Sequence, residues 1–512
     1  MKQYEVHEIT LRGKEPEHDW VNVDVAAEFA LNGEKHKVKG FYAGNGNYKV
    51  RFFPVQTGIC HYKIEGVVSA EGEEIVEPAD GKHGRVRISG THFTYDDGST
   101  YLPFGTTVYA FLHQEKELIE QTLETLRISP FNKLRFCVFP KHYDFNKREP
   151  EIFAFEKKNN KWDVNKPCMA FWEAFEKRIL QLADLGIEAD IILFHPYDRW
   201  GFMNLSEKEC GTYLEYMVRR ISAFPNVWWS LANEYDLMDE FEQKRWEDMA
   251  AYIGKNDIYG HPLSNHNFVR PWDFSNKYTT HCCLQSSQTQ KIPMLIKKYG
   301  KPVLFDEMGY EGNIPYNWGN LSAFEMVNRF WKVCCMGGYG THGETYMEEM
   351  NDQQTLWWSK GGVLKGESPA RIAFLKNLME SFPGPLSHYR PKRGMNIESQ
   401  EQLNELLAEN VPGISDNPVL RVMGKMNGQE FEHMLDVMTQ TQVHYKDEVF
   451  LQYFGDMCTI HGSMDLPEEN LYNVEVIDVW EMTRQTAAEG VNGKVEVKLP
   501  GKPGIALIAV KV

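Results

Sequence analysis

At 512 residues the chain is too long for one ordinary domain, and its length suggests about three. Its 42% hydrophobic and 25% charged residues are typical of a soluble globular protein. The 55 basic and 72 acidic residues leave a formal charge of −17. That balance argues against nucleic acid or an anionic membrane as the main partner, because both require basic patches.

The N-terminus and the cysteines bear on the cellular compartment. Residues 1–5 are mostly polar, so the apolar segment of a secretory signal is not present, and no apolar run reaches the length of a membrane span. The nine cysteines are scattered without a Cys-x-x-Cys spacing, which favours free thiols in a reducing compartment. We therefore expect a cytoplasmic protein; a protein whose leader has been removed is the alternative.

Residues 1–98 have the pattern of short β-strands. Val21, Val23 and Val25 alternate with polar residues, and Asn32-Gly33 is a hairpin signal. Further short apolar segments follow at regular spacing. This pattern predicts an immunoglobulin-like β-sandwich over residues 1–98.

From residue 99 to 385, apolar segments alternate with amphipathic helical patterns. Eight such units have the length and rhythm of a (β/α)₈ TIM barrel. Long loops are expected after the second strand, over residues 140–167, and after the third, over residues 197–200. The fifth and sixth strands have the weakest signals. The predicted strands are 101–107, 133–139, 190–195, 226–231, 262–267, 278–282, 301–307 and 337–346.

Beyond residue 386 the sequence again predicts strands. Apolar segments at 449–454, 474–480 and 505–512 are separated by Gly and Pro turns. We expect a C-terminal β-sandwich-like domain over residues 386–512. The predicted fold class is thus α/β, a barrel flanked by two β domains.

Two predicted barrel strands end in glutamate, at Glu234 and at Glu307. Because the carboxyl ends of barrel strands meet at one rim, the two carboxyls should face each other across the barrel mouth. Glycoside hydrolysis uses such a pair, and a separation of about 5–5.5 Å implies retention while a wider gap implies inversion. Either glutamate alone is more simply a rim carboxylate in a salt bridge, but the pair favours catalysis. We predict Glu234 as the acid/base and Glu307 as the nucleophile.

Other polar residues at strand ends are candidates for substrate binding. Asn233 is placed to donate to a sugar 2-hydroxyl, and His195 and Trp200 are placed to shape a subsite after the third strand. Arg135, on the second strand, is suited either to keeping a carboxylate ionised or to a structural ion pair. These two readings of Arg135 are equally consistent with the sequence.

The Asn-Glu pair ending strand four and the Glu ending strand seven resemble the pattern of clan A glycoside hydrolases, of which the family 5 enzymes are typical. The matching residues are Asn233, Glu234, Glu307 and Arg135, and the resemblance covers about residues 99–385. With a β-sandwich in front and a small β domain behind, the chain also resembles bacterial glycosidases with apiosidase-like barrels.

This resemblance implies a retaining β-glycoside hydrolase that uses no metal or organic cofactor. It also implies that His281, near the end of the sixth strand, lies beside the nucleophile. The family's strand-eight tryptophan is missing here, and Tyr346 stands in that region. Trp357 and Trp358 follow, so these three aromatic residues are candidates for sugar stacking.

The expected substrate is a short oligosaccharide or a plant-type glycoside, cleaved from its end. The two long loops would close one end of the site into a pocket, which binds a terminal sugar. The first alternative is a non-catalytic carbohydrate-binding barrel. A weaker one is a barrel metallohydrolase in which His266 and His281 join Glu307, although the chain has no His-x-His or HExxH motif. The oligomeric state is not predicted.

Overall fold

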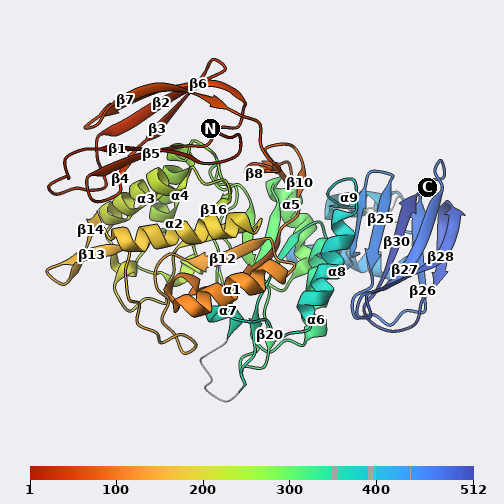
Figure 1. The fold of residues 1–512 in the computed structure, drawn as a ribbon. Coiled ribbons are helices and arrows are strands. Elements are labelled where there is room, and N and C mark those ends of the chain that lie inside the picture. The colour runs from red at the N-terminus through yellow and green to blue at the C-terminus, as the bar shows by residue number, and fades with distance from the viewer. Residues whose placement is uncertain (349–355, 390–396, 398, 439) are drawn as a thin grey trace. The chain divides into compact units, whose positions relative to one another are not determined.

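The computed structural model describes residues 1–348, 356–389, 397, 399–438 and 440–512 (Figure 1). They form two units. The first contains Met1–Ser286, Tyr299–Ala323 and Gly340–Ala370, and the second contains Ser287–Lys298, Phe324–Tyr339 and Arg371–Val512. Among the described residues, no helix combines the length and the apolar character needed to cross a membrane.

Two antiparallel sheets form the N-terminal part of the first unit. Alternate residues of β2, such as Val25 and Phe29, are buried between the sheets, and the Phe29 ring stacks on Phe52 with centroids 4.4 Å apart. The predicted β-sandwich is therefore confirmed. Its sheets are β1(His7–Arg12)–β5(Asn47–Phe52)–β4(Phe41–Tyr42) and β3(Glu34–Lys39)–β2(Val25–Leu31)–β6(Gly58–Gly66)–β7(Ala70–Val76).

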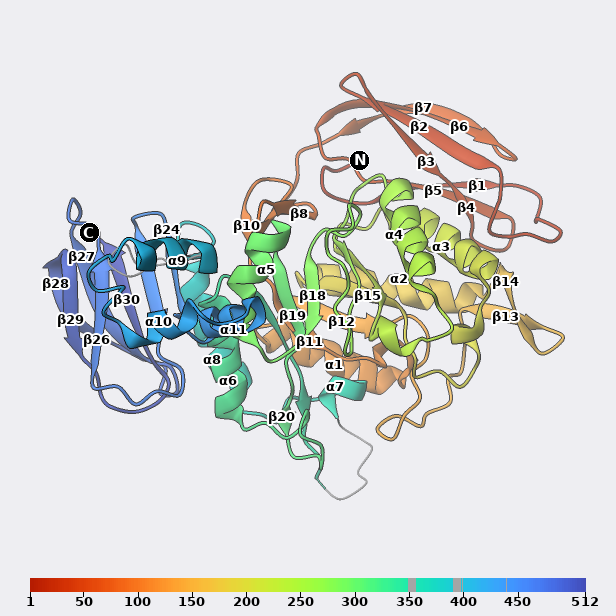
Figure 2. The same ribbon diagram turned by 180° about the vertical axis from the view of Figure 1, so that it is seen from behind.

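Eight parallel strands follow as the predicted barrel, in the order β17-β16-β15-β12-β11-β21-β19-β18. A bridge between His266 and Cys283 links the two outer strands, so the barrel is nearly closed. The helices of the first unit lie outside the strands in both views (Figures 1 and 2). The strands are β11(Phe104–Thr107), β12(Lys133–Cys137), β15(Glu188–Phe194), β16(Val227–Ala232), β17(Leu263–Ser264), β18(Cys282–Gln285), β19(Val303–Glu307) and β21(Tyr339–His342). The helices of the first unit include α1(Lys116–Ile128), α2(Met169–Asp184), α3(Glu207–Ile221) and α4(Gln243–Asn256).

The sixth strand lies further along the chain than the sequence predicts. Residues 276–279 form a turn, in which the Asn276 side chain accepts from the backbone N–H of Tyr278 at 2.9 Å. The Asn276 carbonyl accepts from Thr279 at 3.1 Å. An asparagine that bonds its own backbone two residues on favours a turn over a strand. The strand therefore starts at Cys282 and ends at Gln285, which changes the residue at the barrel rim.

The loop after β12 contains a hairpin that the sequence analysis did not predict. Its strands are β13(Phe155–Lys158) and β14(Lys161–Pro167), and they pair antiparallel. Asn159 and Asn160 between them have φ of 50° and 60°. Two consecutive left-handed residues fit the two-residue turn whose twist matches paired strands. The loop thus has a framework of its own.

The second unit carries the C-terminal strands. A six-stranded sheet and a two-stranded sheet enclose a core that includes Phe450, Met464 and Leu507, which confirms the predicted β-sandwich-like domain. Their orders are β23(Ser387–His388)–β24(Gln442–Tyr445)–β25(Val449–Tyr453)–β30(Ile505–Lys511)–β27(Tyr472–Asp478)–β28(Thr483–Val491) and β26(His461–Leu466)–β29(Gly493–Lys498).

Residues 400–438 correct the expectation that the chain becomes β from residue 386 onward. They form three helices, α9(Gln400–Ala408), α10(Pro418–Met423) and α11(Gly428–Met438). The Ser399 side chain caps α9, and Asn417 caps α10 with proline at its first position. Leu403 and Leu420 are buried in a small core of their own. These short helices are amphipathic, so their apolar residues are too few to stand out in a scan for strands.

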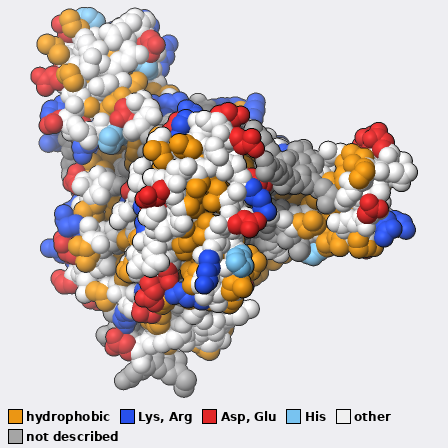
Figure 3. All heavy atoms as spheres, turned by 90° about the vertical axis from the view of Figure 1, so that its right-hand side faces the viewer, with side chains coloured by type: hydrophobic (Ala, Val, Ile, Leu, Met, Phe, Trp, Pro, Cys, Tyr) orange, Lys and Arg blue, Asp and Glu red, His pale blue; other side chains and the backbone are white. Residues whose placement is uncertain are grey.

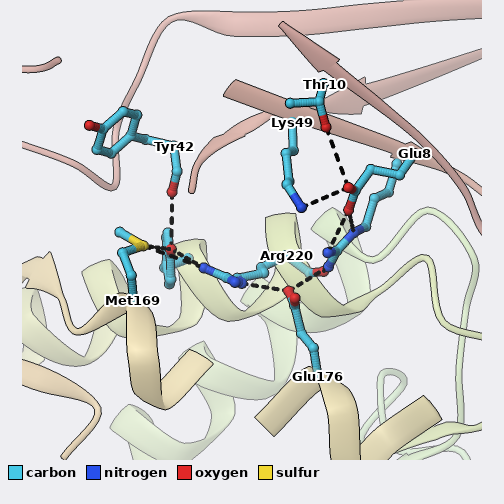
Figure 4. A network of polar contacts seen from close by, with 9 residues as sticks. Glu8, Thr10, Tyr42, Lys49, Met169, Glu176 and Arg220 are labelled. Atoms are coloured by element: carbon cyan, nitrogen blue, oxygen red, sulfur yellow. Dashed lines mark hydrogen bonds and ion pairs between the residues drawn. The ribbon is translucent and has the colours of Figure 1, made fainter. Parts of the chain in front are cut away.

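A buried ion-pair network joins the sandwich to helices α2 and α3 (Figure 4). Arg51 on β5 contacts Glu8 on β1 at 2.7 Å and Glu176 on α2 at 2.6 Å. Arg220 on α3 pairs with the same Glu176 carboxylate. Burial would raise the pKa of Glu176, but the charges of Arg51 and Arg220 outweigh it and hold this pKa below its ordinary value. Glu8 and Glu176 thus supply two carboxylates for the two buried arginines, and Glu176 contacts both of them.

Glu176→Ala is expected to lower the free energy of unfolding by about 3–5 kcal/mol, because it leaves the buried Arg220 without its carboxylate partner. A lower midpoint of thermal unfolding by circular dichroism checks this. Glu173 is exposed on the same helix, and Glu173→Ala serves as the control that should leave the midpoint unchanged. Equal midpoints for the two variants would contradict a stabilising role for the network.

Acidic and basic side chains are interspersed with apolar ones on the face that Figure 3 shows. Binding to a nucleic acid backbone needs basic side chains gathered on one face. In this view the described basic side chains are not gathered in one place.

Candidate active site

Glu234 and Glu307 lie together at the rim of the barrel. Glu234 follows β16 by two residues, Glu307 is the last residue of β19, and the two are 5% and 8% exposed. The Gln285 amide at the end of β18 lies between them. With its nitrogen turned toward the carboxyls, it donates to Glu234 Oε1 at 3.1 Å and to Glu307 Oε2 at 3.2 Å. One side chain thus bridges both candidate catalytic groups.

The backbone at Glu234 is held in an unusual conformation. Its φ of 54° and ψ of 55° lie in the left-handed region, which a non-glycine residue adopts at a cost and mostly at functional sites. Its backbone N–H donates to His266 Nδ1 at 3.3 Å, and its Oε2 accepts from the Tyr197 hydroxyl. The neighbouring Asn233 accepts from the Tyr109 hydroxyl at 2.8 Å. These bonds fix the direction of the Asn233-Glu234 pair.

The two carboxyls have different electrostatic surroundings. Burial raises the pKa of Glu234, and the charge of Lys141 and the hydroxyl of Tyr197 oppose that rise. Burial raises the pKa of Glu307 to about 8, opposed by Tyr310. The Tyr310 hydroxyl lies beside Glu307 without completing a hydrogen bond of ordinary geometry. Burial therefore favours the protonated form of both carboxyls.

Arg135 lies deeper in the barrel than the two glutamates. It is fully buried, and its Nη1 donates to Asp190 and to Ser230 Oγ, each at 3.2 Å. Its positive charge also helps Lys133 to lower the pKa of Asp306 against the effect of burial. These contacts are those of the structural ion pair, one of the two readings that the sequence allows. A role toward Glu307 stays a prediction.

His281 lies at the opposite end of β18 from Gln285, the residue that contacts Glu307. It precedes β18 and packs against the rings of Phe93 and Trp228, with centroids 6.0 and 5.2 Å away. Phe93 belongs to β9(His92–Tyr95) of the small sheet with β8(Val86–Ser89) and β10(Thr100–Tyr101). The prediction fails because β18 starts four residues later than expected, and Gln285 takes the place beside Glu307.

The other predicted binding residues lie in different surroundings. His195 is buried, and its Nε2–H donates to the Phe139 carbonyl at 3.1 Å. Burial lowers the pKa of His195 to about 3, so its ring is neutral. Tyr346 donates to Glu311 Oε1 at 2.9 Å. Trp200 Nε1 donates to Glu149 Oε1 at 2.7 Å.

The two candidate tryptophans after strand eight are both buried, and Trp358 is 5% exposed. Trp357 is 1% exposed and donates to Thr106 at 2.8 Å, so it belongs to the core. Trp358 packs against Tyr310 at 5.6 Å and against Trp318 at 5.1 Å between ring centroids. Trp318 is 36% exposed and was not predicted from the sequence. The Tyr310 N–H donates to the Trp318 carbonyl at 2.7 Å, which places this tryptophan near Glu307.

Sequence reasoning also missed most of the residues that support the two glutamates. They share a position, since each ends a barrel strand or follows one within a few residues. That position is the signal that would have found them. They are Tyr109, Lys141, Tyr197, Gln285 and Tyr310.

Glu311, His342 and Glu344 are a buried group whose ligand atoms lie within 4.8 Å of one another, as metal ligands do. This group includes none of Glu307, His266 and His281. The Glu311 carboxylate accepts from the backbone N–H groups of residues 367 and 368, and Glu344 from those of residues 365 and 366. Both carboxylates thus bind the backbone leading into α8(Ser368–Glu380), where negative charge stabilises a helix N-terminus.

Residues 88–384 match a family model described as the apiosidase-like catalytic domain. Residues 1–66 and 437–511 match two further models, each described as a domain of unknown function. No curated protein matches the chain.

Two solved structures from Bacteroides vulgatus ATCC 8482 are similar to this protein. One, whose name assigns it provisionally to the glycoside hydrolases, is 31% identical over 100% of this chain and 99% of that one, with a TM-score of 0.84. The other, a family 5 glycoside hydrolase, is 14% identical over 84% of this chain and 94% of that one, with a TM-score of 0.59, and shares the fold. The family match over residues 88–384 and the identity along the whole chain place this protein in the apiosidase-like family, and it is a glycoside hydrolase of that family.

Proposed function

We propose that the protein is a retaining β-glycoside hydrolase in which Glu307 is the nucleophile and Glu234 the acid/base. The supporting observation is the Gln285 bridge. One oxygen of Glu234 and one of Glu307 both lie within 3.2 Å of the Gln285 side-chain nitrogen. These two oxygens are therefore separated by no more than twice that distance. Inverting enzymes keep their carboxyls about 6.5–9.5 Å apart to admit a water, and retaining enzymes about 5–5.5 Å apart. The bridge therefore favours double displacement.

In the first step, a Glu307 oxygen attacks the anomeric carbon, and Glu234 gives its proton to the leaving oxygen. The products are a glycosyl ester on Glu307 and a free alcohol. In the second step, Glu234 takes a proton from water, the resulting hydroxide attacks the anomeric carbon, and Glu307 leaves as a carboxylate. Two inversions give net retention.

Asn233 is placed to bind a substrate hydroxyl during both steps. Its Oδ1 accepts from Tyr109 at 2.8 Å, whereas its Nδ2 is buried without a hydrogen-bond partner among the described residues. Burying a donor without a partner costs free energy. The unpaired Nδ2 of Asn233 therefore points to an acceptor that the substrate supplies. A sugar 2-hydroxyl beside the anomeric carbon would complete this bond, which strengthens in the transition state.

The loops after β12 and β15 support cleavage from the chain end. Trp162 of the hairpin donates through Nε1 to the Trp200 carbonyl at 2.8 Å, and Trp200 Nε1 donates to Glu149. These bonds tie the two loops into one wall on the side of the rim where active sites of barrels lie. A walled site encloses a terminal sugar, so we propose exo-action on short oligosaccharides or plant-type glycosides.

The experiment that tests this function has two readouts. A panel of nitrophenyl glycosides first identifies the sugar, and ¹H NMR then follows the configuration of the product released at early times. Retention requires the first-formed anomer to match the substrate. With an end-labelled hexasaccharide of that sugar, single terminal residues should appear first. An inverted first product would refute double displacement, and early internal fragments would refute exo-action.

Trp318→Ala is expected to lower kcat/KM about tenfold, mainly through KM. Trp318 is 36% exposed, packs against Trp358 near Glu307 and offers its ring to a sugar face. Trp318→Phe keeps an aromatic face and should retain most of the activity. Steady-state kinetics on the cleaved nitrophenyl glycoside provide the measurement, and an unchanged KM in Trp318→Ala would exclude Trp318 as a sugar platform.

A further inference from the structure

Lys141 is a buried lysine at the rim, four residues after the end of β12, and only 3% exposed. Its Nζ lies 3.7 Å from the ring centroid of Tyr109, 4.3 Å from that of Tyr197 and 4.9 Å from that of Tyr143. The negative face of an aromatic ring attracts a cation, most strongly where water is excluded. The three rings come from the loops after the adjacent strands β11, β12 and β15, so the barrel itself assembles this cage.

Two of the three tyrosines are the residues that hold the Asn233-Glu234 pair. The Tyr109 hydroxyl donates to Asn233 and the Tyr197 hydroxyl donates to Glu234. A positive charge against a phenol ring strengthens the donor at its far end, because linked polar groups polarise one another. The ammonium therefore acts on both members of the pair through the tyrosines, and on Glu234 directly through its charge.

Hydrogen bonds hold the backbone on both sides of the Lys141 side chain in place. Asn146 Nδ2 donates to the Lys141 carbonyl at 2.7 Å. The next residue, His142, donates its N–H to the Tyr197 carbonyl at 2.9 Å, which joins the two loops. The ammonium is thus held beside Glu234 before any substrate binds.

We propose that Lys141 is a positioning residue whose caged ammonium orients the Asn233-Glu234 pair and sets the charge state of Glu234. The proposal rests on Glu234 being the acid/base of the proposed function. An acid/base must hold a proton in the first step and lose it in the second, so its ionisation has to lie near the working pH.

The sign of the effect follows from the groups around Glu234. Those that face it are Lys141, Tyr197, Asp236, Gln285 and, at the end of β19 and just after it, the Glu307 carboxyl that Gln285 also binds and Tyr310. Burial and the charge of Asp236 raise the pKa of Glu234, while the charge of Lys141 lowers it. Burial lowers the pKa of Lys141 to about 8, against the charge of Glu234. The ammonium is therefore charged below about pH 8 and loses its effect above that pH.

The test compares Lys141→Met, which removes the charge, with Lys141→Arg, which keeps it. In the pH profile of kcat/KM, the limb that reports Glu234 is the one that disappears in Glu234→Ala with an activated aryl glycoside. Lys141→Met should move that limb to higher pH by about one unit, and Lys141→Arg should leave it in place. Lys166, which lies over the Trp20 ring at 4.0 Å, gives the matched control Lys166→Met with an unchanged profile.

A second readout does not depend on turnover. The carboxyl ¹³C resonance of Glu234, assigned by its absence in Glu234→Gln, should titrate at higher pH in Lys141→Met than in the wild type. If this resonance and the kinetic limb both stay in place, the inference is overturned. If the resonance moves while Glu234→Ala keeps its limb, the role of Lys141 stands and the catalytic role given to Glu234 fails. Unfolding midpoints confirm that each variant is folded.

Discussion

Glu307→Gln is expected to lower the hydrolysis of an aryl glycoside by about a million-fold, the scale seen when a nucleophile is removed from a serine protease. An amide oxygen cannot form the glycosyl ester, so the covalent route is lost for every leaving group. The variant should stay folded. Burial raises the pKa of Glu307 to about 8, which means that the folded protein favours the neutral side chain. Between its ordinary pKa and 8 this side chain ionises in the unfolded chain but stays neutral in the folded one, so it lowers stability increasingly as pH rises, and glutamine removes this cost.

Initial rates, unfolding midpoints and trapping together check this expectation. A 2-deoxy-2-fluoro glycoside of the substrate sugar should label the wild type, and peptide mass spectrometry should place the label on Glu307. The label should be absent from Glu307→Gln. Glu348→Gln is the control, because Glu348 is an exposed glutamate that pairs with Lys365. A Glu307→Gln variant that keeps a tenth of the activity would remove Glu307 from the mechanism.

Elements with long apolar runs could be predicted from the sequence. The strand β15 consists of seven buried residues, and the polar pair Asn233-Glu234 directly follows β16. The sequence therefore predicts both that these segments are strands and where they reach the barrel rim. The strand β17 has two residues, and its place depends on the neighbours that pair with it. Such a strand leaves no periodic signal, because periodicity needs several residues to show.

The same limit explains why Gln285, and not the predicted His281, lies beside Glu307. Side chains alternate between the faces of a strand and only its last residues reach the rim, so an error in the strand end changes the rim residue. The turn at Asn276 decides where β18 starts, and that turn competes with a plausible strand of β-branched residues at 279–280. Local preference favoured the strand, whereas a side-chain hydrogen bond favours the turn.

The Lys141 cage could not be read from the sequence for a different reason. Tyr109 and Tyr197 are separated along the chain by two strand–helix units, and only barrel closure brings their rings against one ammonium. Each residue alone is an ordinary loop residue. The glutamates were recognisable because their chemistry is specific to a reaction, whereas their supporting residues are defined by position alone.

Glu234→Ala is expected to lose activity in proportion to the leaving group's need for a proton. General acid catalysis contributes roughly 10²–10⁴-fold, so glycosides of poor leaving groups should slow by about that factor. A glycoside of an acidic phenol leaves with little protonation and should form the glycosyl ester at close to the wild-type rate. The ester then accumulates, because no base activates water. Rates measured across aryl glycosides of graded phenol pKa provide the slope that distinguishes these cases.

Azide separates the loss of an acid/base from a general loss of structure. Alanine leaves space where the Glu234 carboxyl stood, and azide needs no base, so it should attack the accumulated ester and restore turnover. The product should be a glycosyl azide with the anomeric configuration of the substrate, since Glu307 still shields the opposite face. Glu234→Gln, which keeps the volume and the Tyr197 contact, should gain little from azide. Uniform loss across leaving groups without an azide product would show that Glu234 is not the acid/base. Rescue by azide in Glu234→Ala but not in Glu234→Gln would show that the lost acid/base function belongs to the Glu234 carboxyl, which Tyr197 and Gln285 contact.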